Sequence, residues 1–574
     1  MSSKPKKPRG RPKKKSMAGT ASMTNPGRPV KTDLTNLSYS TLNRRLHDLA
    51  EKFDHEALER AVSISKRKRN YVEVESTENT HSQVNVHKLE TAFAFFMDHD
   101  YSKITWDALV EDTTQHGAPI YPSYYKLSKV KKECRPSVYT EETETCVQVP
   151  FQIMLNKSAE RLVTAVGIDW LPEDLNNLVL ICAYGFDSSS GFINPHQKFE
   201  DPENETLTTS ELSLFASTFI LCGLKTETGK NMWMNPTPQS VRFCRPLRIA
   251  IEKEDEYSIR AEDSRLRKEI SNLRPYTFSL PNGKRASVRF DLYLSMIDGK
   301  CLNAVLGNSA TTRCPVCYVL MNRFNEDEDW NSTVPPGNLL HGIANLHCEI
   351  KTLELLLKLS SRRTFKEWRI EKDMKRAFKK KFAAVKKKLW HAFSIRVGEV
   401  KHGSGTSLNG NTARTCFKDP LKVANVLGIN ADLVKRLSYI VLAFKQKQGL
   451  NLETLGKYCT ETYKLFFKLY PWAKMNPSVH KMLRHGADIA RNFPFSLAYF
   501  AEDSAESMHK YYRKNSVHHA RQNSRANRLK DVFNRAVDMS DPLISMVNLE
   551  KRCKFHKEEL PSEFVTIFGI NDEF

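Results

Sequence analysis

The hydrophobic positions between residues 160 and 300 come in short runs that end at turn residues, a pattern typical of β-strands. The run at 178–184 is continuously apolar, and a serine-rich turn is predicted just after Asp187. A run of this length predicts a strand that is buried on both faces and holds Asp187 at its end. The alternative is that Asp187 only starts the turn, which is a common role for aspartate.

Further strands are predicted at residues 219–224 and 241–251, followed by a charged helix at 254–274. A hairpin comes next, in which residues 276–280 and 286–297 flank a Pro-Asn-Gly-Lys turn. Three strands, a helix and a further strand form the order of an RNase H-like core. The predicted fold class is therefore α/β with such a core.

The last predicted strand is followed by Asp298 and a glycine, so a second strand ends in an aspartate. Carboxylates placed rigidly at strand ends suit a metal-dependent phosphoryl-transfer site. A later helix near residues 500–515 carries three more acids, which are Glu502, Asp503 and Glu506. One of these acids is expected to complete the site.

The net charge indicates the partner. The chain carries 88 Lys+Arg against 66 Asp+Glu, a formal net charge of +22, which points to a polyanion and most simply to nucleic acid. No apolar stretch approaches the length of a membrane span, so no membrane partner is expected. The twelve cysteines are scattered apart from one close pair. This usage suits a reducing compartment and makes the pair a metal candidate.

The N-terminal tail, residues 1–25, is basic and is predicted to be disordered. Its segment KKPRGRPKKK resembles an AT-hook, in which Arg9 and Arg11 would lie along the floor of an A·T minor groove. A nuclear-localisation signal is the compatible alternative.

Residues 26–72 predict two short amphipathic helices and a basic arm, a pattern that favours a small DNA-binding module. Its candidate DNA contacts are Arg28, Arg44 and Arg45. The pattern fits a helical hairpin for dimerisation as well. Residues 73–160 are predicted to be a helical dimerisation or linker region.

A lysine-rich stretch at 372–388 holds nine basic residues and one acid, with bases on every side of a predicted helix. Such a helix is either a solvated face or a phosphate-contacting surface, and the two interpretations have equal weight.

Seven short motifs occur in this chain in the order found in Transib transposases, which are relatives of the catalytic subunit of the V(D)J recombinase. They are YGFDSSSG, NPTPQSVRFCRPLRI, LSMIDGK, CPVC, LHCEIKTLELLLKLS, HKMLRH and AEDSAESMHKYYR. The resemblance covers about residues 160–530. More loosely, residues 26–70 are similar to the recombinase's nonamer-binding segment.

The resemblance implies that the catalytic carboxylates are Asp187, Asp298 and Glu506. Their hard oxygen ligands fit Mg²⁺ or Mn²⁺, two per active site. One ion would activate a water or a 3′-hydroxyl, and the other would stabilise the leaving oxygen. Glu502 lies one helical turn before Glu506 and is the rival for third ligand.

Three basic residues share the helical face of Glu506, because they lie four, seven and eight positions beyond it. These residues, Lys510, Arg513 and Lys514, are expected to hold DNA phosphates beside the metals.

A zinc site is predicted from two pairs of ligands. Cys314 and Cys317 have C-x2-C spacing, and His480 and His485 have H-x4-H spacing, which together make a Cys2His2 set for one structural Zn²⁺. The competing source of ligands is His347-Cys348.

The interval from Asp298 to Glu506 is 208 residues, far more than an RNase H core needs. We therefore predict a core that begins at residues 161–312, a helical zinc-binding insertion at 313–498 and a catalytic helix within 499–540. Residues 541–574 are predicted to be a C-terminal tail.

The predicted function is that of a nuclear, homodimeric cut-and-paste DNA transposase. It would bind terminal inverted repeats, nick beside them, form hairpins on the flanking ends and join the excised 3′ ends to target DNA. The first alternative is a domesticated DNA-binding regulator with the same fold and no transposition activity. The second alternative is a zinc-stabilised architectural protein.

Overall fold

The computed structural model describes residues 87–167, 175–190, 199–200, 213–308, 310–326, 334–398, 408–547, 549 and 559–570. The contacts divide the chain into two units, Met1–Gln83 and Val84–Phe574. The second unit has a mixed α/β fold. The predicted basic tail and N-terminal module lie outside the described residues, together with Arg9, Arg11, Arg28, Arg44 and Arg45.

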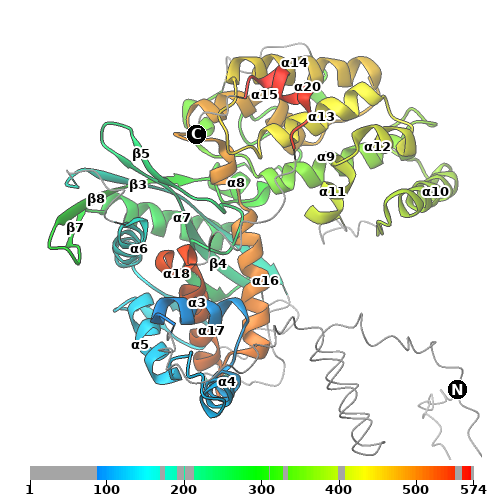
Figure 1. The fold of residues 1–574 in the computed structure, drawn as a ribbon. Coiled ribbons are helices and arrows are strands. Elements are labelled where there is room, and N and C mark those ends of the chain that lie inside the picture. Colours follow the sequence, from blue (N-terminus) through cyan, green and yellow to red (C-terminus); the bar gives the residue numbers. More distant parts are fainter. Residues whose placement is uncertain are drawn as a thin grey trace, which may run out of the picture. The chain divides into compact units, whose positions relative to one another are not determined.

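An eight-stranded mixed sheet has the strand order β1-β2-β6-β4-β3-β8-β7, and β5 pairs with β4 (Figure 1). The long strand β3 (Leu178–Ser190) pairs antiparallel with β4 (Ser213–Thr226) and parallel with β8 (Arg285–Leu294). The other strands are β1 (Glu141–Glu142), β2 (Cys146–Gln148), β5 (Asn231–Met234), β6 (Cys244–Ile251) and β7 (Tyr276–Ser279).

The predicted order of elements is confirmed. Strands β3, β4 and β6 are followed by α7 (Glu256–Ser271) and by the antiparallel hairpin of β7 and β8. The short strand β5 was not predicted. It has only four residues, so it is too short to give a pattern that the sequence could reveal.

Two details of the strand ends differ from the prediction. The turn predicted directly after Asp187 is wrong, because β3 continues to Ser190 and Asp187 pairs with Ala216 of β4. The long ladder to β4 holds this polar segment in a strand. Asp298 does not end a strand either, since β8 ends at Leu294 and Asp298 instead caps helix α8 (Gly299–Val305).

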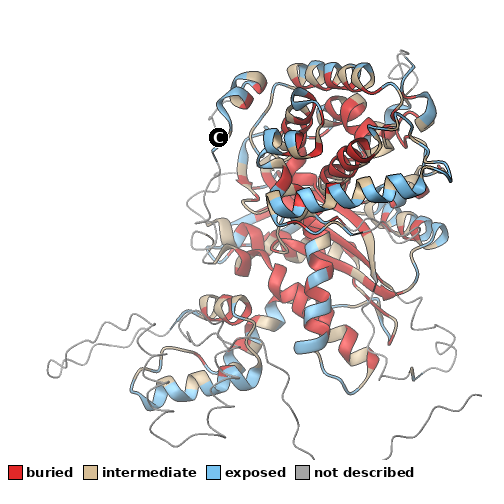
Figure 2. Ribbon diagram, turned by 90° about the vertical axis from the view of Figure 1, so that its right-hand side faces the viewer, coloured by how far each residue is buried: buried red, intermediate tan, exposed pale blue. Residues whose placement is uncertain are grey.

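The core of the sheet lies around the first half of β3. Residues 178–184 are all buried, which confirms the predicted burial on both faces (Figure 2). Helix α16 (Asp503–His518) contacts β3, β4 and β6, while α6 (Phe151–Val166) and α17 (Arg525–Ser540) contact β6. The catalytic-helix candidate therefore packs directly on the strand that carries Asp187.

The chain between β8 and α16 is mainly helical, as the pattern predicts. Helix α9 contacts α10, α11, α13 and α15, and α14 packs against α15. The helices of this region are α9 (Asn345–Arg362), α10 (Lys375–Phe393), α11 (Gly410–Phe417), α12 (Pro420–Leu427), α13 (Ala431–Ala443), α14 (Leu452–Leu469) and α15 (Pro477–Arg491), with the 3₁₀ turns η4 (Met321–Arg323), η6 (Pro336–Leu340) and η7 (Leu497–Phe500).

The segment before the sheet packs on the core. Its helices α3 (Leu89–Asp98) and α5 (Tyr124–Cys134) contact α17, and α3 also contacts α18 (Pro542–Met546). The guanidinium of Arg135 lies 2.7 Å from the Asp538 carboxylate. Helix α4 (Lys103–Gln115) contacts α5. The described part of residues 73–160 is mainly helical but also contains β1 and β2, and its predicted role in dimerisation stays a prediction.

The C-terminal segment, predicted as a tail, contains two helices in its described residues. Besides α18, it forms α20 (Ser562–Phe568), which contacts α14. The Lys435 ammonium lies 2.8 Å from the Glu563 carboxylate and links α20 to α13. Among the described helices, none has both the length and the apolar composition needed to cross a membrane.

Candidate active site and metal centre

A close approach of two backbone segments brings the two aspartates to one place. A Cβ atom at Gly185 would lie 2.0 Å from the main-chain oxygen of Met296, so only glycine fits here. The Tyr184 carbonyl accepts hydrogen bonds from the N–H groups of Ser295 and Met296, both at 3.1 Å. The chain after β8 is therefore held against β3 between Tyr184 and Asp187. Two residues after Met296 comes Asp298.

Asp298 is the N-cap of α8, and its side chain accepts a hydrogen bond of 2.7 Å from the Cys301 N–H. Burial raises the pKa of Asp298, and the negative charge of Asp187 raises it further. Two carboxyls that hinder each other's ionisation are stabilised by a cation between them.

Glu506 lies in the first turn of α16. Burial raises the pKa of Glu506, and the charge of Asp187 is the next cause. Asp187 thus couples to both of the other predicted carboxyls. The three acids come from β3, from the start of α8 and from α16, and Asp187 lies near each of the other two.

Glu254, just after β6, is a fourth acid at this site that the sequence analysis missed. Ligand atoms of Asp187, Glu254 and Cys301 all lie within 4.8 Å of one another, in a group that does not include Asp298 or Glu506. The Glu254 carboxylate accepts a hydrogen bond from the Ser188 hydroxyl and lies 3.1 Å from the Lys300 ammonium. Glu254 sits in a run of five charged residues after the strand, and the sequence gives no signal that selects it from this run.

His347, at the start of α9, contacts two of the acids near α16. Its Nδ1 lies 3.1 Å from Glu502 Oε1, and its main-chain N–H also donates to that oxygen at 3.1 Å. Burial lowers the pKa of His347, but the hydrogen bond and the charge of Glu502 outweigh it and raise the pKa to about 10. Glu502 is therefore engaged in an ion pair with a protonated imidazole.

Asp503 is engaged as well, because the Arg414 guanidinium lies 2.9 Å from its carboxylate. The third acid, Glu506, lies 3.9 Å from His347 Nε2, and 39% of its side chain is exposed. Of the three acids on this segment, Glu506 is the one that faces both solvent and Asp187. This arrangement favours Glu506 over Glu502 as the third ligand.

A second histidine, His509, was also missed by the sequence analysis. It is buried on α16, and its Nε2 lies 3.6 Å from Asp187 Oδ2. Its Nδ1 is buried and has no hydrogen-bond partner among the described residues. The position of His509, three residues beyond Glu506, is the signal that could have identified it, since it shares a helical face with that acid.

The three basic residues predicted on α16 differ in their surroundings. Lys510 and Arg513 are exposed, and Arg513 Nε donates to the His509 carbonyl at 3.5 Å. Lys514 instead pairs with Asp100, in the connection between α3 and α4. Lys510 and Arg513 are therefore open to a ligand, whereas Lys514 holds α16 to the segment before the sheet.

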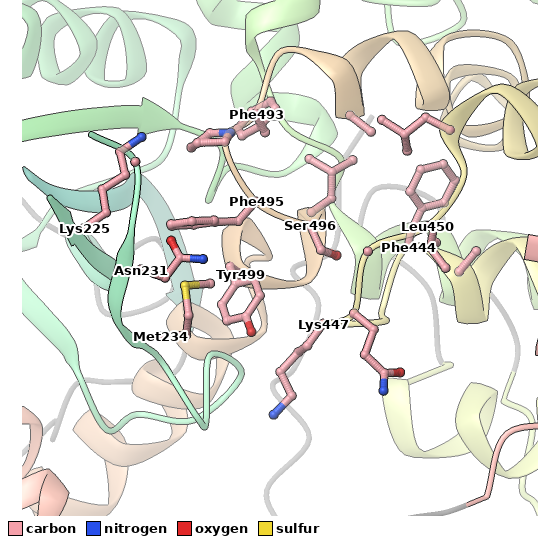
Figure 3. A pocket seen from close by; sticks show the side chains of 18 of the residues that line it. Lys225, Asn231, Met234, Phe444, Lys447, Leu450, Phe493, Phe495, Ser496 and Tyr499 are labelled. Carbon is pink, nitrogen blue, oxygen red and sulfur yellow. The ribbon is translucent and has the colours of Figure 1, made fainter. Parts of the chain in front are cut away.

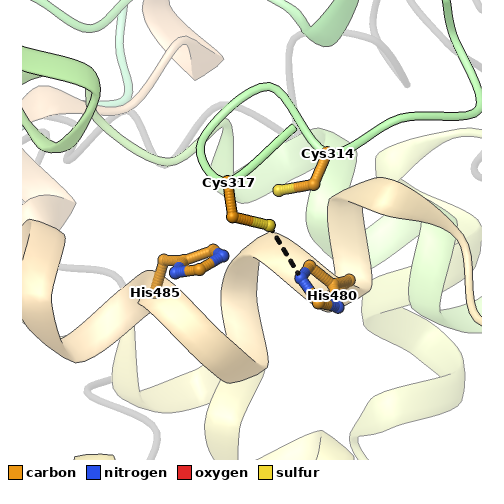
Figure 4. A group of neighbouring side chains, drawn as sticks. All are labelled: Cys314, Cys317, His480 and His485. Carbon is orange, nitrogen blue, oxygen red and sulfur yellow. Dashed lines mark hydrogen bonds between the residues drawn. The ribbon is translucent and has the colours of Figure 1, made fainter. Parts of the chain in front are cut away.

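The predicted Cys2His2 set forms a compact cluster. Ligand atoms of Cys314, Cys317, His480 and His485 all lie within 4.8 Å of one another, and all four residues are buried (Figure 4). Cys317 Sγ lies 3.5 Å from His480 Nε2. Both ring nitrogens of His485 are buried without a hydrogen-bond partner in the described part of the chain. A metal ion at this point would satisfy one of them.

The protonation states of the cluster suit a metal. Hydrogen bonding from Cys314, together with the contributions of His480 and His485, lowers the pKa of Cys317 to about 2 against the effect of burial, whereas burial and the bond to Cys317 raise the pKa of Cys314. Burial lowers the pKa of His480 to about 4, which leaves a neutral ring. A thiolate beside a neutral imidazole is the donor set that Zn²⁺ uses in structural sites.

Second contacts orient the ligands of this cluster. The Tyr463 hydroxyl lies 3.2 Å from His480 Nδ1, and the Phe324 ring stacks on the same imidazole at 3.8 Å. The competing ligand source is excluded by position: His347 pairs with Glu502, and the Cys348 thiol donates to the Ser478 carbonyl at 3.7 Å.

A pocket of about 760 Å³ lies elsewhere, among β5, the loop after α13 and the chain between α15 and η7 (Figure 3). Its lining includes Met234, Phe444, Phe493 and Phe495, and it contains no acid, histidine or cysteine. It adjoins Lys225 of β4, whereas Asp187 pairs with Ala216 of the same strand. Nine residues of strand, about 30 Å, separate these positions, so the pocket is distinct from the carboxylate site.

A scan against protein-family models finds no match to this chain, and a search of curated proteins finds none either.

Proposed function

We propose that this chain is a Transib-like DNA transposase that acts by metal-dependent phosphoryl transfer. The observation that carries the proposal is the convergence of Asp187, Asp298 and Glu506 from three elements, with Asp187 raising the pKa of both other carboxyls. Carboxylates that repel one another in this way fit hard divalent cations.

The sheet supports an RNase H-like core. In the order β6-β4-β3-β8, strand β4 is antiparallel to both neighbours, while β3 and β8 are parallel. The first three strands form a meander, and α7 precedes the hairpin that delivers β8. These are the features expected of that core, with α16 as its later helix.

Asp187, Asp298 and Glu506 would hold two Mg²⁺ or Mn²⁺ ions, which activate the nucleophile and stabilise the leaving oxygen when bound. The chain's own residues prepare this site. The Cys301 N–H fixes one oxygen of Asp298, and the ion pair with His347 keeps Glu502 away from the ligand position.

The same displacement serves nicking, hairpin formation and joining. In nicking, a water oxygen bonds to phosphorus and the 3′ oxygen leaves. In hairpin formation and in joining, a 3′-hydroxyl takes the place of water, and a strand oxygen leaves. The exposed side chains of Lys510 and Arg513, on the helix that carries Glu506, would hold neighbouring phosphates.

The Cys2His2 cluster would hold one structural Zn²⁺. Cys314 and Cys317 follow α8, and His480 and His485 lie on α15, the last long helix before α16. A metal there would tie the chain beside Asp298 to the approach of Glu506. The zinc would thereby fix the geometry of a site that it does not touch.

DNA is the proposed partner, in keeping with the net charge of +22. We further propose a nuclear homodimer, because two DNA ends must be handled together and a C2 dimer supplies one site for each.

The test uses labelled duplexes that carry the inverted repeats flanking the chain's own coding sequence. With Mg²⁺, the full chain should produce nicks and then hairpins on the flanking side, and Asp187→Asn should produce neither while binding the same duplex. Binding without any cleavage by the wild-type chain would overturn the proposal in favour of a DNA-binding regulator.

A further inference from the structure

Helix α10 carries a charge pattern that the carboxylate site does not use. Between Lys375 and Lys388 it contains eight basic residues, and α10 contains no acid. Only Val385 and Leu389 are buried, so a narrow apolar stripe attaches the helix to its neighbours. Figure 2 turns this side of the molecule toward the viewer, and α10 is the long, mostly pale-blue helix in front.

Six of the eight basic side chains of α10 form two rows along the helix, and all six are exposed except Lys386, which is half-buried. Lys375, Lys379 and Lys386 share one row, and Arg376, Lys380 and Lys387 share the next, because they repeat at four and seven residues. Within a row, consecutive charges are about 6 Å and about 10 Å apart at the helical rise of 1.5 Å per residue. The shorter interval is close to the spacing of phosphates along a DNA strand.

An exposed aromatic residue continues this surface. Trp390 is 44% exposed although it is large and apolar, and the Arg396 guanidinium lies 5.2 Å from its ring centroid. A basic surface with an exposed indole at one end is suited to a nucleic-acid backbone.

Within the described structure, no acidic side chain compensates the charges of α10, and Lys386 lies over the Phe382 ring. None of its eight Lys and Arg side chains forms an ion pair with a described residue. Lys375 and Lys379, like Arg376 and Lys380, are like charges at i and i+4, which destabilise a helix. The first turn of α10 has no acid and no side-chain cap, so its positive charges also oppose the helix dipole. A bound polyanion would relieve both effects.

The length of α9 sets the distance between α10 and the carboxylate site. The helix contacts α9 and α12, and the Arg362 guanidinium at the end of α9 lies 5.0 Å from the Phe378 ring of α10. His347, beside Glu506, lies at the other end of α9. Fifteen residues of helix, about 22 Å, separate His347 from Arg362. This length corresponds to about six or seven base pairs of duplex DNA at 3.4 Å each.

We propose that α10 binds the sugar–phosphate backbone of the DNA that flanks the scissile bond. The proposal rests on the proposed transposase function. Flanking DNA has no fixed sequence, so it can be held through phosphates alone, and lysine side chains bind phosphates without reading bases. A terminal repeat, in contrast, must be recognised through base contacts, which a row of lysines does not supply.

The test removes three exposed charges from α10 in the full chain, as Lys379→Gln/Lys380→Gln/Lys387→Gln. A matched control removes three lysines from α14, Lys457→Gln/Lys464→Gln/Lys468→Gln, and a charge-retaining variant carries arginine at the three α10 positions. Binding is measured against salt for three probes, which are a repeat duplex with a 16-base-pair flank, the same repeat without a flank and a 40-base-pair duplex of arbitrary sequence.

The α10 variant should lose affinity for the flanked repeat and for the arbitrary duplex. Its salt slope on these probes should fall by about 0.9 for each phosphate that the variant no longer neutralises. On the flankless repeat it should match the wild type, and the arginine variant should match the wild type throughout. Unchanged slopes on the flanked repeat would overturn the proposal. An equal loss on the flankless repeat would overturn the assignment to flanking DNA.

The arbitrary duplex separates this proposal from the proposed function. If the wild-type chain never cleaves DNA but the α10 variant alone binds this probe more weakly, the surface is confirmed as a DNA-binding one and the transposase proposal fails. If the wild type cleaves and the α10 variant binds like the α14 control, only the inference about α10 fails.

Discussion

Two candidate metal sites in this chain are built in opposite ways. The Cys2His2 cluster is buried, and its four ligand atoms already lie within 4.8 Å of one another. The carboxylate site is half-exposed, and its predicted ligands come from three separate elements and carry like charges.

The difference follows from the charge of the ligands. In the cluster, a thiolate and imidazole rings attract one another, because the histidines stabilise the charge of Cys317. In the carboxylate site, Asp187 makes ionisation of its neighbours harder. A site that is assembled beforehand and sealed suits a permanent structural ion. A site that is open and strained by repulsion suits ions that arrive with a phosphate substrate and leave with it.

The largest expected effect is the loss of cleavage when a ligand of the carboxylate site is replaced. Asp187→Asn, Asp298→Asn or Glu506→Gln should each lower cleavage by on the order of 10³-fold or more, since each removes a metal ligand from a group that acts as a unit. DNA binding should stay near the wild-type value, because no group that holds a phosphate is removed. Gel assays of nicking and binding on one labelled duplex measure both quantities.

Glu502→Gln is the matched control for Glu506→Gln. It has the same chemistry one helical turn away, at an acid already paired with His347. Glu502→Gln should retain metal-dependent cleavage at a reduced rate. If Glu506→Gln cleaved at the wild-type rate and Glu502→Gln did not, the third ligand would be Glu502.

The next effect concerns the cluster. Cys314→Ser/Cys317→Ser should lose a tightly held Zn²⁺ and several kcal/mol or more of folding free energy, because no preformed site exists in the unfolded chain. Cleavage should be lost as well, although neither residue belongs to the carboxylate site. Metal analysis and thermal unfolding of the purified chain provide the measurements.

Cys459→Ser, at a buried cysteine of α14 outside the cluster, is the control for losing a buried thiol. This variant should keep its metal. A double mutant at Cys314 and Cys317 that retained one zinc per chain and full activity would show that the cluster is not a zinc site.

A third variant, Gly185→Ala, changes the distance between the two aspartates without removing a metal ligand. Gly185→Ala places a Cβ 2.0 Å from the Met296 carbonyl oxygen, so β3 and the chain before Asp298 must move apart. Overpacking of this kind costs typically about 1–3 kcal/mol. A displacement of about 1 Å between the aspartates should lower cleavage by about 10²-fold while the Zn²⁺ content is unchanged.

Gly337→Ala is the control, since a Cβ at that position meets nothing within 4 Å. Equal activity of the two variants would mean that the backbone contact at Gly185 does not set the distance between the carboxylates.

The sequence predicted the order of the strands from local patterns. It predicted the ligands of the cluster from the spacing within each pair together with the family resemblance, since Cys317 and His480 are 163 residues apart. Continuous apolar runs identified β3 and the hairpin, and the spacing of Cys314 and Cys317 identified the pair. The sequence could not predict Glu254 or His509 as neighbours of Asp187, because their proximity depends on how β6 and α16 pack against β3. The same holds for His347, whose partner Glu502 lies 155 residues away.

The prediction for the end of β3 was wrong for a related reason. Asp and Ser favour turns locally, yet pairing with β4 keeps residues 187–190 extended. At residues 187–190, pairing with β4 therefore outweighs the local preference for a turn. For the AT-hook-like tail and the N-terminal module, the sequence predictions remain predictions.

The smallest expected effect is a change in how folding stability depends on pH, and it arises from His347 in the carboxylate site. The ion pair with Glu502 raises the pKa of His347 to about 10, while an unfolded histidine titrates near 6.5. The folded state therefore binds this proton more tightly. Its contribution to stability is complete below about pH 6.5 and is lost as pH rises through about 10. Between these values the wild-type chain should lose stability with rising pH, whereas His347→Gln should lose less.

Urea unfolding at pH 6.5, 8 and 9.5 measures this difference, with His391→Gln as the control at an exposed histidine of α10. Glu502→Gln should flatten the pH dependence as His347→Gln does, because either change removes the pair. The buried cluster should respond differently. Its Cys317 favours the thiolate in the folded chain, whereas an unfolded cysteine keeps its proton up to about pH 8.5, so this residue adds a rise of stability with pH that the wild type and His347→Gln share. If the stability of the wild type and of His347→Gln changed with pH at the same slope, the ion pair with Glu502 would not keep His347 protonated. The argument that this pair leaves Glu506 as the third ligand would then lose its basis.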